Sequence, residues 1–355
     1  MSSAKNLYRR GEANKGNRFN PYHDTMFTVL DPEQHDKVKA MVAAASSGRD
    51  TPGLESNVDD QVRSLIALIR GKYISSYGKL RPLSLSRISG LFTLDVISKV
   101  ALGDEFGYLR SDADLHEPYS TLRAYIQFME TDAYGMGKPM GLTNIAVRKR
   151  FAPDTLPQRD MLGSFIRHDL NQQSCETESL FIFVAGSDTT AATIRVTMLH
   201  VLSNPRVYHS LKAEVKRAIQ EGKVSTPITS AEGKALQYLQ AVMYEGLRIR
   251  PIVSGLIFKS VPLSGDTING RFLPGGTAVG TNMPSLLRNN HTFAEDADIV
   301  RPERFLELDS NGLAEMRRNV ELQFGCGRRM CAGKPLAQIE LNKVFFWIGH
   351  HSRDR

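Results

Sequence analysis

A glycine-rich loop near the end of the chain reads Phe324-Gly325-Cys326-Gly327-Arg328-Arg329-Met330-Cys331-Ala332-Gly333. Glycine permits tight turns with positive φ and a close approach of the backbone to a flat ligand. Cys331 stands directly before a helix-forming run in which Pro335 suits the first turn. A helix N-terminus with Arg328 and Arg329 beside it favours the thiolate form of a cysteine, and the sulfur that ligates a haem iron is a thiolate. A glycine turn around a structural cysteine is the alternative interpretation.

The composition limits the classes of protein that need considering. A chain of 355 residues with 41% hydrophobic content can bury a substantial core in one or two domains. The formal charge of +7 favours an acidic partner or an anionic membrane surface, and because the basic residues are dispersed without a nucleic-acid motif, nucleic acid is not expected. Three cysteines are too few for a disulfide framework, which indicates a reducing compartment. No apolar run reaches the ~18 residues of a membrane span, and the polar start of the chain is not a signal peptide.

Apolar residues spaced three and four apart predict a series of helices. These helices cover Gln34–Ala45 after the start signal Asp31-Pro32-Glu33, Asn57–Tyr77, Leu85–Leu102, Tyr119–Met129, a short stretch from Asp160, Glu176–Leu202, Arg206–Gln220, Lys234–Arg250, Met283–Arg288 and the run after Cys331. Short runs broken by glycines predict small hairpins at Val253–Val261, Asp266–Phe272 and Thr277–Thr281. Residues 131–157 show no clear periodicity, and residues 306–323 read as an irregular charged meander. The predicted fold class is mainly α with a small β portion.

The longest predicted helix contains Ala185-Gly186-Ser187-Asp188-Thr189-Thr190, a run of mostly poor helix formers. In one interpretation Gly186 lets a flat cofactor or dioxygen approach the backbone, while Asp188 and Thr189 face a groove and pass protons from carboxylate to hydroxyl. In the other, the helix kinks and the hydroxyls bond their own backbone carbonyls. The residues alone leave both interpretations open.

A pair of opposite charges lies on the next long helix. Glu245 and Arg248 are three residues apart and so project from one face. A surface ion pair of this kind contributes little. Downstream, however, the sequence Pro302-Glu303-Arg304-Phe305 supplies a further guanidinium, and a carboxylate buried between two guanidiniums would be costly to break.

Three motifs therefore occur in a fixed order: Ala-Gly-x-Asp-Thr-Thr, then Glu-x-x-Arg with Pro-Glu-Arg-Phe, then Phe-x-x-Gly-x-Arg-x-Cys-x-Gly. The chain resembles the cytochrome P-450 family, and most of its length is similar to fungal microsomal members. This resemblance implies a cytochrome P-450 fold, incomplete, in which residues 1–355 form a single partial domain. It also implies roles for individual residues. Cys331 would be the axial thiolate and metal ligand of heme b, with Phe324 beside the sulfur and Arg329 and His35 (or Lys37 or Lys39) at the haem propionates. Gly325, Gly333 and Ala185 would lie along the cofactor, and Asp188 and Thr189 would be catalytic residues. Glu245, Arg248 and Arg304 would form a structural cluster.

By the same resemblance the protein is a haem-dependent monooxygenase that inserts one oxygen atom of O2 into an apolar small molecule in fungal secondary metabolism. An NADPH-dependent flavoprotein reductase would supply the electrons. The family is typically bound to the endoplasmic reticulum, but the lack of an anchor here predicts a cytoplasmic or peripheral protein.

Two alternatives stay open. The family's N-terminal strands, its pair of roof helices and its C-terminal strands are absent or compressed in this sequence, which allows a truncated, catalytically inactive member that does not retain haem. The second alternative is a metal or redox pair formed by Cys326 and Cys331, although no second cysteine pair supports it.

Overall fold

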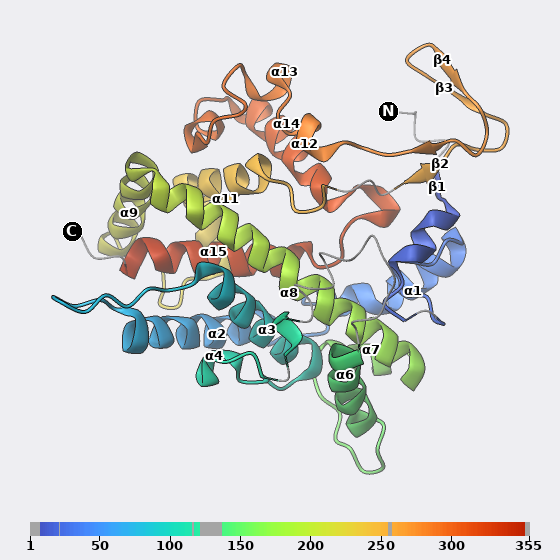
Figure 1. The fold of residues 1–355 in the computed structure, drawn as a ribbon, viewed down its shortest axis with the longest axis horizontal. Coiled ribbons are helices and arrows are strands. Elements are labelled where there is room, and N and C mark those ends of the chain that lie inside the picture. Colours follow the sequence, from blue (N-terminus) through green and yellow to red (C-terminus); the bar gives the residue numbers. More distant parts are fainter. Residues whose placement is uncertain (1–7, 21, 116, 121–136, 255–257, 352–355) are drawn as a thin grey trace.

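The computed structural model describes residues 8–20, 22–115, 117–120, 137–254 and 258–351. The protein is mainly helical with a small β portion, as the sequence predicts. Helix α8 (Gln172–Ser203) crosses the centre of the molecule, and helices α3 (Leu85–Leu102) and α6 (Gly137–Arg150) pack against it (Figure 1). The fold is therefore built around the helix that carries the Asp188-Thr189 motif.

The remaining elements surround this centre. The α-helices are α1 (Pro32–Ser46), α2 (Leu54–Leu68), α4 (Tyr108–Ser111), α7 (Met161–Arg167), α9 (Pro205–Gln220), α10 (Ser230–Ala235), α11 (Gln237–Ile249), α12 (Met283–Leu286), α13 (Asn290–Phe293), α14 (Ser310–Glu321) and α15 (Lys334–His351). A π-helical turn, Ile69–Tyr73, extends α2, and 3-10 turns occupy Glu12–Asn17, Pro302–Phe305, Leu322–Phe324 and Gly327–Arg329.

Side-chain caps explain where several helices begin. Asp31 accepts a hydrogen bond from the Gln34 N–H, and Pro32 takes the first position of α1. Asn171 caps α8, Asn204 caps α9, and Asp160 caps α7. Each cap satisfies backbone donors that the helix itself cannot, which stabilises the helix by about 1 kcal/mol. These starts agree with the predicted ones to within a few residues.

The core lies between α3 and α8. Leu91, Phe92 and Ile97 on α3 and Phe183 on α8 are almost fully buried. A Cβ on Gly186 would lie 2.7 Å from Ile97 Cδ1, so the glycine allows the two helices to approach closely. This packing against α3 is one structural reason for a glycine at position 186, and its role beside a cofactor or dioxygen stays a prediction.

Two small sheets complete the fold. Strands β1 (Arg9–Arg10), β2 (Lys259–Ser260) and β5 (Ala278–Val279) form an antiparallel sheet in the order β1-β2-β5, with Arg10 opposite Lys259. Strands β3 (Asp266–Ile268) and β4 (Arg271–Leu273) form a hairpin that projects from the body (Figure 1). The first sheet joins the start of the described chain to its later half.

The predicted hairpin at Asp266–Phe272 is confirmed as β3–β4, where Asn269 and Gly270 adopt positive φ and turn the chain. Several other predicted elements differ from the observed ones. Residues 306–323 are not irregular: Asp309 caps α14, whose Met316 and Val320 are buried one turn apart. Helix α6 occupies part of the stretch without clear periodicity. Leu236 has an extended backbone and divides Lys234–Arg250 into α10 and α11. Most of the predicted helix Tyr119–Met129 lies outside the described residues.

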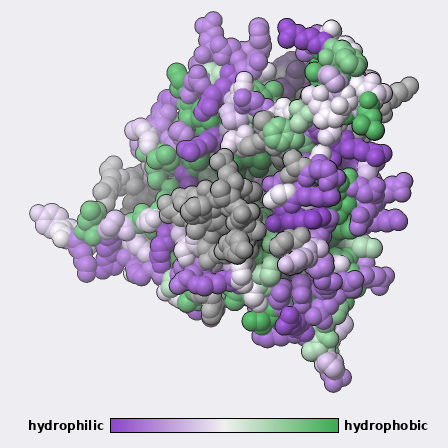
Figure 2. All heavy atoms as spheres, turned by 45° about the vertical axis from the view of Figure 1, so that its right-hand side comes forward, coloured by the Kyte–Doolittle hydropathy of each residue, from purple (hydrophilic) through white to green (hydrophobic). Residues whose placement is uncertain are grey.

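Polar side chains cover most of the face shown in Figure 2, and apolar ones occur there in small groups. Among the helices of the described chain, none combines the length and the apolar character needed to cross a bilayer.

Candidate active site around the cysteine loop

Backbone geometry fixes the shape of the cysteine loop. Gly325 (φ +75°) and Gly327 (φ +60°) have positive φ angles, which residues with side chains rarely adopt. Gly333 does not have a positive φ angle. The N–H of Cys331 donates to the carbonyl of Phe324 at 2.7 Å, which closes the loop and brings these two residues together. The thiol of Cys331 is free and exposed just before α15. The sequence correctly predicted a loop followed directly by a helix.

Opposing effects act on the Cys331 thiol. Partial exclusion of water by the surrounding protein raises the pKa of Cys331, while the N–H groups of Gly333 and Lys334 and the charge of Lys39 lower it. The net shift is upward, so these favourable interactions offset the effect of burial only in part. By contrast, burial raises the pKa of Cys175 to about 12, and that thiol sits inside the core. Only the loop cysteines can meet a ligand from outside the core.

Helix α1 is fastened to the loop. Lys39 Nζ donates to the carbonyl oxygens of Arg328 at 2.6 Å and Met330 at 2.9 Å. Arg328 Nε lies 3.2 Å from Asp36 Oδ2. These contacts hold Arg328 and Met330, which precede Cys331 in the loop, against α1. Lys37, the third candidate on this helix, is exposed.

Three basic residues gather beside this junction, and we call Arg10, His35 and Arg329 the basic cluster. Arg10 and His35 are buried. Burial, together with the charge of Arg329, lowers the pKa of Arg10 to about 10. Burial also lowers the pKa of His35, and the charges of Arg329 and Lys39 add to the effect of burial, although Asp36 opposes it. Each shift follows first from burial, and the neighbouring positive charges act in the same direction.

Hydrogen bonds in the basic cluster go mainly to the protein backbone. Arg10 donates to the carbonyl of Phe27, with its guanidinium 4.2 Å from the centre of the Phe27 ring. Arg329 Nη2 donates to the carbonyl of Leu30 at 3.4 Å, while its buried Nη1 has no hydrogen-bond partner within the described residues. The sequence did not point to Arg10. Arg10 lies on β1 and Arg329 lies in the cysteine loop near the other end of the chain, so only the folded structure brings the two charges together.

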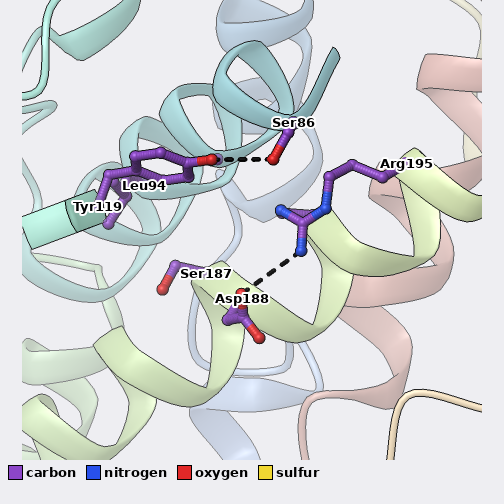
Figure 3. A pocket seen from close by; sticks show the side chains of 8 residues that line it. Ser86, Leu94, Tyr119, Ser187, Asp188 and Arg195 are labelled. Carbon is purple, nitrogen blue, oxygen red and sulfur yellow. Dashed lines mark hydrogen bonds and ion pairs between the residues drawn. The ribbon is translucent and has the colours of Figure 1, made fainter. Parts of the chain in front are cut away.

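The motif on α8 lies in an uninterrupted helix. Thr189 Oγ1 donates to the carbonyl of Ala185 at 2.9 Å, and Ser187 Oγ to that of Val184 at 3.1 Å. The hydroxyls therefore bond their own backbone, as one interpretation predicted, within a helix that is continuous from Gln172 to Ser203. Thr189 is exposed, whereas Asp188 lies beside α3 and pairs with Arg195, Oδ1 to Nη2, at 3.6 Å (Figure 3). Consecutive in sequence, Asp188 and Thr189 point to different sides of the helix.

Glu245, Arg248 and Arg304 meet in the interior, and we call them the Glu245 cluster. All three are buried, with exposed fractions of 1%, 0% and 3%. The guanidinium of Arg248 binds both carboxylate oxygens of Glu245 at 2.8 Å, and Arg304 Nε lies 3.2 Å from the same carboxylate. The Arg301 N–H also donates to Glu245, at 2.7 Å.

Backbone carbonyls complete this cluster. Arg248 Nη1 donates to the carbonyls of Leu287 and Ala297. Arg304 donates to those of Phe293 and Ile299. The cluster therefore ties α11 to the segment 287–304, which leads through α14 into the cysteine loop.

The structure thus brings the predicted residues together in separate groups. Cys331, Phe324, Arg329 and His35 lie around the loop, and the Glu245 cluster braces the chain behind it. Ala185, Asp188 and Thr189 share α8, and the described contacts do not join them to the loop. Nowhere in the described chain do three histidine, cysteine or acidic side chains gather as a metal site would require. A Cys326–Cys331 metal pair therefore has no further ligands among the described residues.

A family model described as Cytochrome P450 matches residues 143–348, which is more than half of the chain. The matched segment contains α8, the Glu245 cluster and the cysteine loop. The chain belongs to the cytochrome P450 family, as its motifs predicted, and it is a monooxygenase of the P450 type.

Fungal relatives agree with this assignment. The chain is 47% identical over 375 aligned residues to the cytochrome P450 monooxygenase aba1 of Botryotinia fuckeliana, covering 98% of this chain and 74% of the relative. It is 41% identical to the cytochrome P450 monooxygenase abl1 of Leptosphaeria maculans, covering 98% and 66%. It is 27% identical to the pisatin demethylase of Fusarium vanettenii, covering 97% and 72%.

Proposed function

We propose that the chain is a single cytochrome P450 domain that binds heme b, and that Cys331 would be the residue that ligates the iron. The observation that carries this proposal is the basic cluster beside the loop, where a buried guanidinium nitrogen of Arg329 has no partner among the described residues. Burying charge without compensation is unfavourable, so the site calls for an anionic group. Haem has two propionates and an iron that accepts sulfur, and both features fit the residues present.

The protein residues would divide the work as follows. Cys331 would supply the thiolate, and the N–H groups of Gly333 and Lys334 would stabilise its negative charge. Arg329 and His35 would bind the propionates, with Arg10 adding positive charge. Phe324 would shield the sulfur side of the loop, where its backbone already holds Cys331. Gly325 and Gly333 would leave room at the loop, and Ala185 would face the cofactor from α8.

Bound haem would supply the oxygen-activating chemistry, which belongs to the cofactor. Asp188 and Thr189 would be the catalytic residues of proton delivery, supplying a carboxylate and a hydroxyl from different sides of α8, and one oxygen atom of O2 would leave as water. The other atom would enter an apolar small molecule of fungal secondary metabolism. Electrons would come from an NADPH-dependent flavoprotein reductase, whose acidic surface would complement this basic chain.

The Glu245 cluster would have a structural role. Because Glu245, Arg248 and Arg304 are buried and bonded to one another, they can hold the segment before the cysteine loop in one position. Their contribution to the reaction would be the position of Cys331 and no contact with substrate.

The reduced, carbon-monoxide-bound absorption spectrum of the purified protein tests this function. We expect a thiolate-type Soret band, lost in Cys331→Ala and retained in Cys326→Ala, because only Cys331 bonds back to Phe324 and meets the α15 N-terminus. Failure of the wild-type protein to take up haem would favour the inactive alternative. Loss of the band in Cys326→Ala with retention in Cys331→Ala would show that Cys326 is the iron ligand and that Cys331 is not.

A further inference from the structure

The chain between β1 and α1 contains a short segment, residues 25–30, that we call the strap. Arg10 and Arg329 of the basic cluster each donate a hydrogen bond to one of its carbonyl oxygens. The strap leads into α1, the helix that carries His35. All three members of the basic cluster are therefore connected through this segment, and its position affects how they are held.

Helix α8 also contacts the strap. Glu178 Oε1 accepts a hydrogen bond from the Met26 N–H at 2.5 Å. The ring of Phe27 stacks on that of Phe181, with centroids 5.5 Å apart and an angle of 18° between the ring planes. Glu178 and Phe181 are three residues apart and so share one face of α8. The strap therefore joins the basic cluster to α8 by one hydrogen bond and one aromatic contact.

The carboxyl group of Glu178 is almost entirely excluded from water. Its side chain is 2% exposed, and Oε2 has no hydrogen-bond partner among the described residues. Burial raises the pKa of Glu178 to about 7, and the Met26 N–H opposes this rise only in part. The neutral carboxyl is therefore the form that this site accommodates best.

No charged side chain on another described element acts on Glu178. On α8 itself, the charge of Glu178 acts on Cys175, whose thiol has a pKa of about 12 and stays protonated at neutral pH. The other titratable groups near the strap and on this part of α8 have partners of their own: Asp24 with Arg18, His23 with Gln173, and Glu176 with Arg148. An ionised Glu178 would therefore be an uncompensated buried charge.

We propose that Glu178 is a positioning residue of the basic cluster and that it acts through the strap as a pH-sensitive latch: the protonated carboxyl holds the strap on α8, and loss of its proton to solvent releases the strap. This inference rests on the proposed haem site, because a released strap would take the carbonyl partners of Arg10 and Arg329 with it. A carboxylate is more stable in water than in the protein interior. The latch is therefore strongest below the usual carboxyl pKa of 4.5 and is lost as pH rises through about 7.

Hydrogen exchange at the Met26 amide of the haem-loaded protein tests the latch. After correction for the intrinsic pH dependence of exchange, the protection of this amide should fall about tenfold between pH 6 and pH 8, given pKa values of 4.5 and about 7 in the released and held states. Glu178→Gln keeps the acceptor without a charge and should show no such fall. Glu176→Gln, two residues away on α8, is the matched control and should behave as the wild-type protein does. An equal fall in Glu178→Gln, or no fall in the wild-type protein, would overturn the latch.

The rate of haem loss tests the positioning role. With excess apomyoglobin as the acceptor, the wild-type protein should lose haem severalfold faster at pH 8 than at pH 6. Glu178→Gln should show a flatter profile, and any contribution of His35 is common to both proteins. Parallel profiles in the two proteins would refute the positioning role and leave the haem site standing. Failure of the wild-type protein to take up haem would refute the haem site itself, and exchange at Met26 in the haem-free chain would still decide the latch.

Discussion

The Glu245 cluster and the basic cluster both bury arginine side chains, yet they differ in how those charges are compensated. In the Glu245 cluster, each side-chain nitrogen of Arg248 and Arg304 has a carboxylate or carbonyl partner. In the basic cluster, Arg10 and Arg329 bond to single backbone carbonyls, and Arg329 Nη1 has no partner among the described residues. The first group is electrostatically complete, and the second is not.

This difference separates residues that stabilise the fold from residues that bind a ligand. A complete buried cluster stabilises one conformation, and loss of a member leaves the others uncompensated. The uncompensated charges of an incomplete cluster destabilise the folded protein unless an anion binds to them. Such a cluster therefore indicates an anion-binding site. The same residue type, arginine, should therefore respond in opposite ways to the same substitution in the two places.

The largest effect is expected at the complete cluster. Arg248→Met should lower the free energy of unfolding by about 3–5 kcal/mol, because it leaves buried carbonyls and part of the Glu245 carboxylate without a donor. Urea unfolding followed by circular dichroism measures the change. A loss below about 1 kcal/mol would mean that the cluster contributes no more than a surface pair.

Arg329→Met should act mainly on binding. We expect haem affinity to fall by about 1.5–3 kcal/mol, the range for a hydrogen bond to a charged group, with little change in the free energy of unfolding without haem. Haem titration followed by absorbance gives the affinity. If the variant loses stability and keeps its affinity, the basic cluster would be structural like the Glu245 cluster, and the contrast between them would fail.

A smaller, pH-dependent effect is expected at His35. Burial lowers the pKa of His35 below its usual value, so the folded protein favours the neutral ring. Stability is therefore full above the unfolded pKa of about 6.5 and is lost as pH falls toward the lowered folded value. Acid unfolding of wild type and His35→Gln without haem should show a weaker pH dependence in the variant.

Bound haem sharpens the His35 prediction. A propionate near the ring would favour its protonated form and raise the pKa of His35. The acid sensitivity of the wild-type protein should then decrease when haem is bound. An identical decrease in His35→Gln would place the propionates elsewhere.

Local signals in the sequence predicted much of the fold. Caps such as Asp31, Asp160 and Asn204 and periodic apolar residues locate helices, because these depend on neighbours within a turn or two. Helix α14 was missed because only Met316 and Val320 are buried in it, among many charged residues. The β3–β4 hairpin was predicted because Gly270 marks its turn locally in the sequence.

The site was predictable where a motif is contiguous and less so where distant segments meet. The spacing around Cys331 indicated a ligand loop before any geometry was known. The direction that Gly186 faces depends on how α3 packs against α8, and the burial of Arg10 beside Arg329 depends on pairing between β1 and β2. Such facts arise from tertiary packing, which no local pattern encodes.

The smallest effect is expected at Arg328, the neighbour of Arg329 on the same loop. Its guanidinium pairs with Asp36 at 3.2 Å, with side-chain exposures of 41% and 48%, and an exposed pair contributes about 0.2–1 kcal/mol. Arg328→Met should therefore lower the free energy of unfolding by no more than that and leave haem affinity unchanged. The two arginines differ in burial and not in charge, so a loss of affinity in Arg328→Met as large as in Arg329→Met would show that net loop charge, and not the incomplete buried cluster, attracts the cofactor.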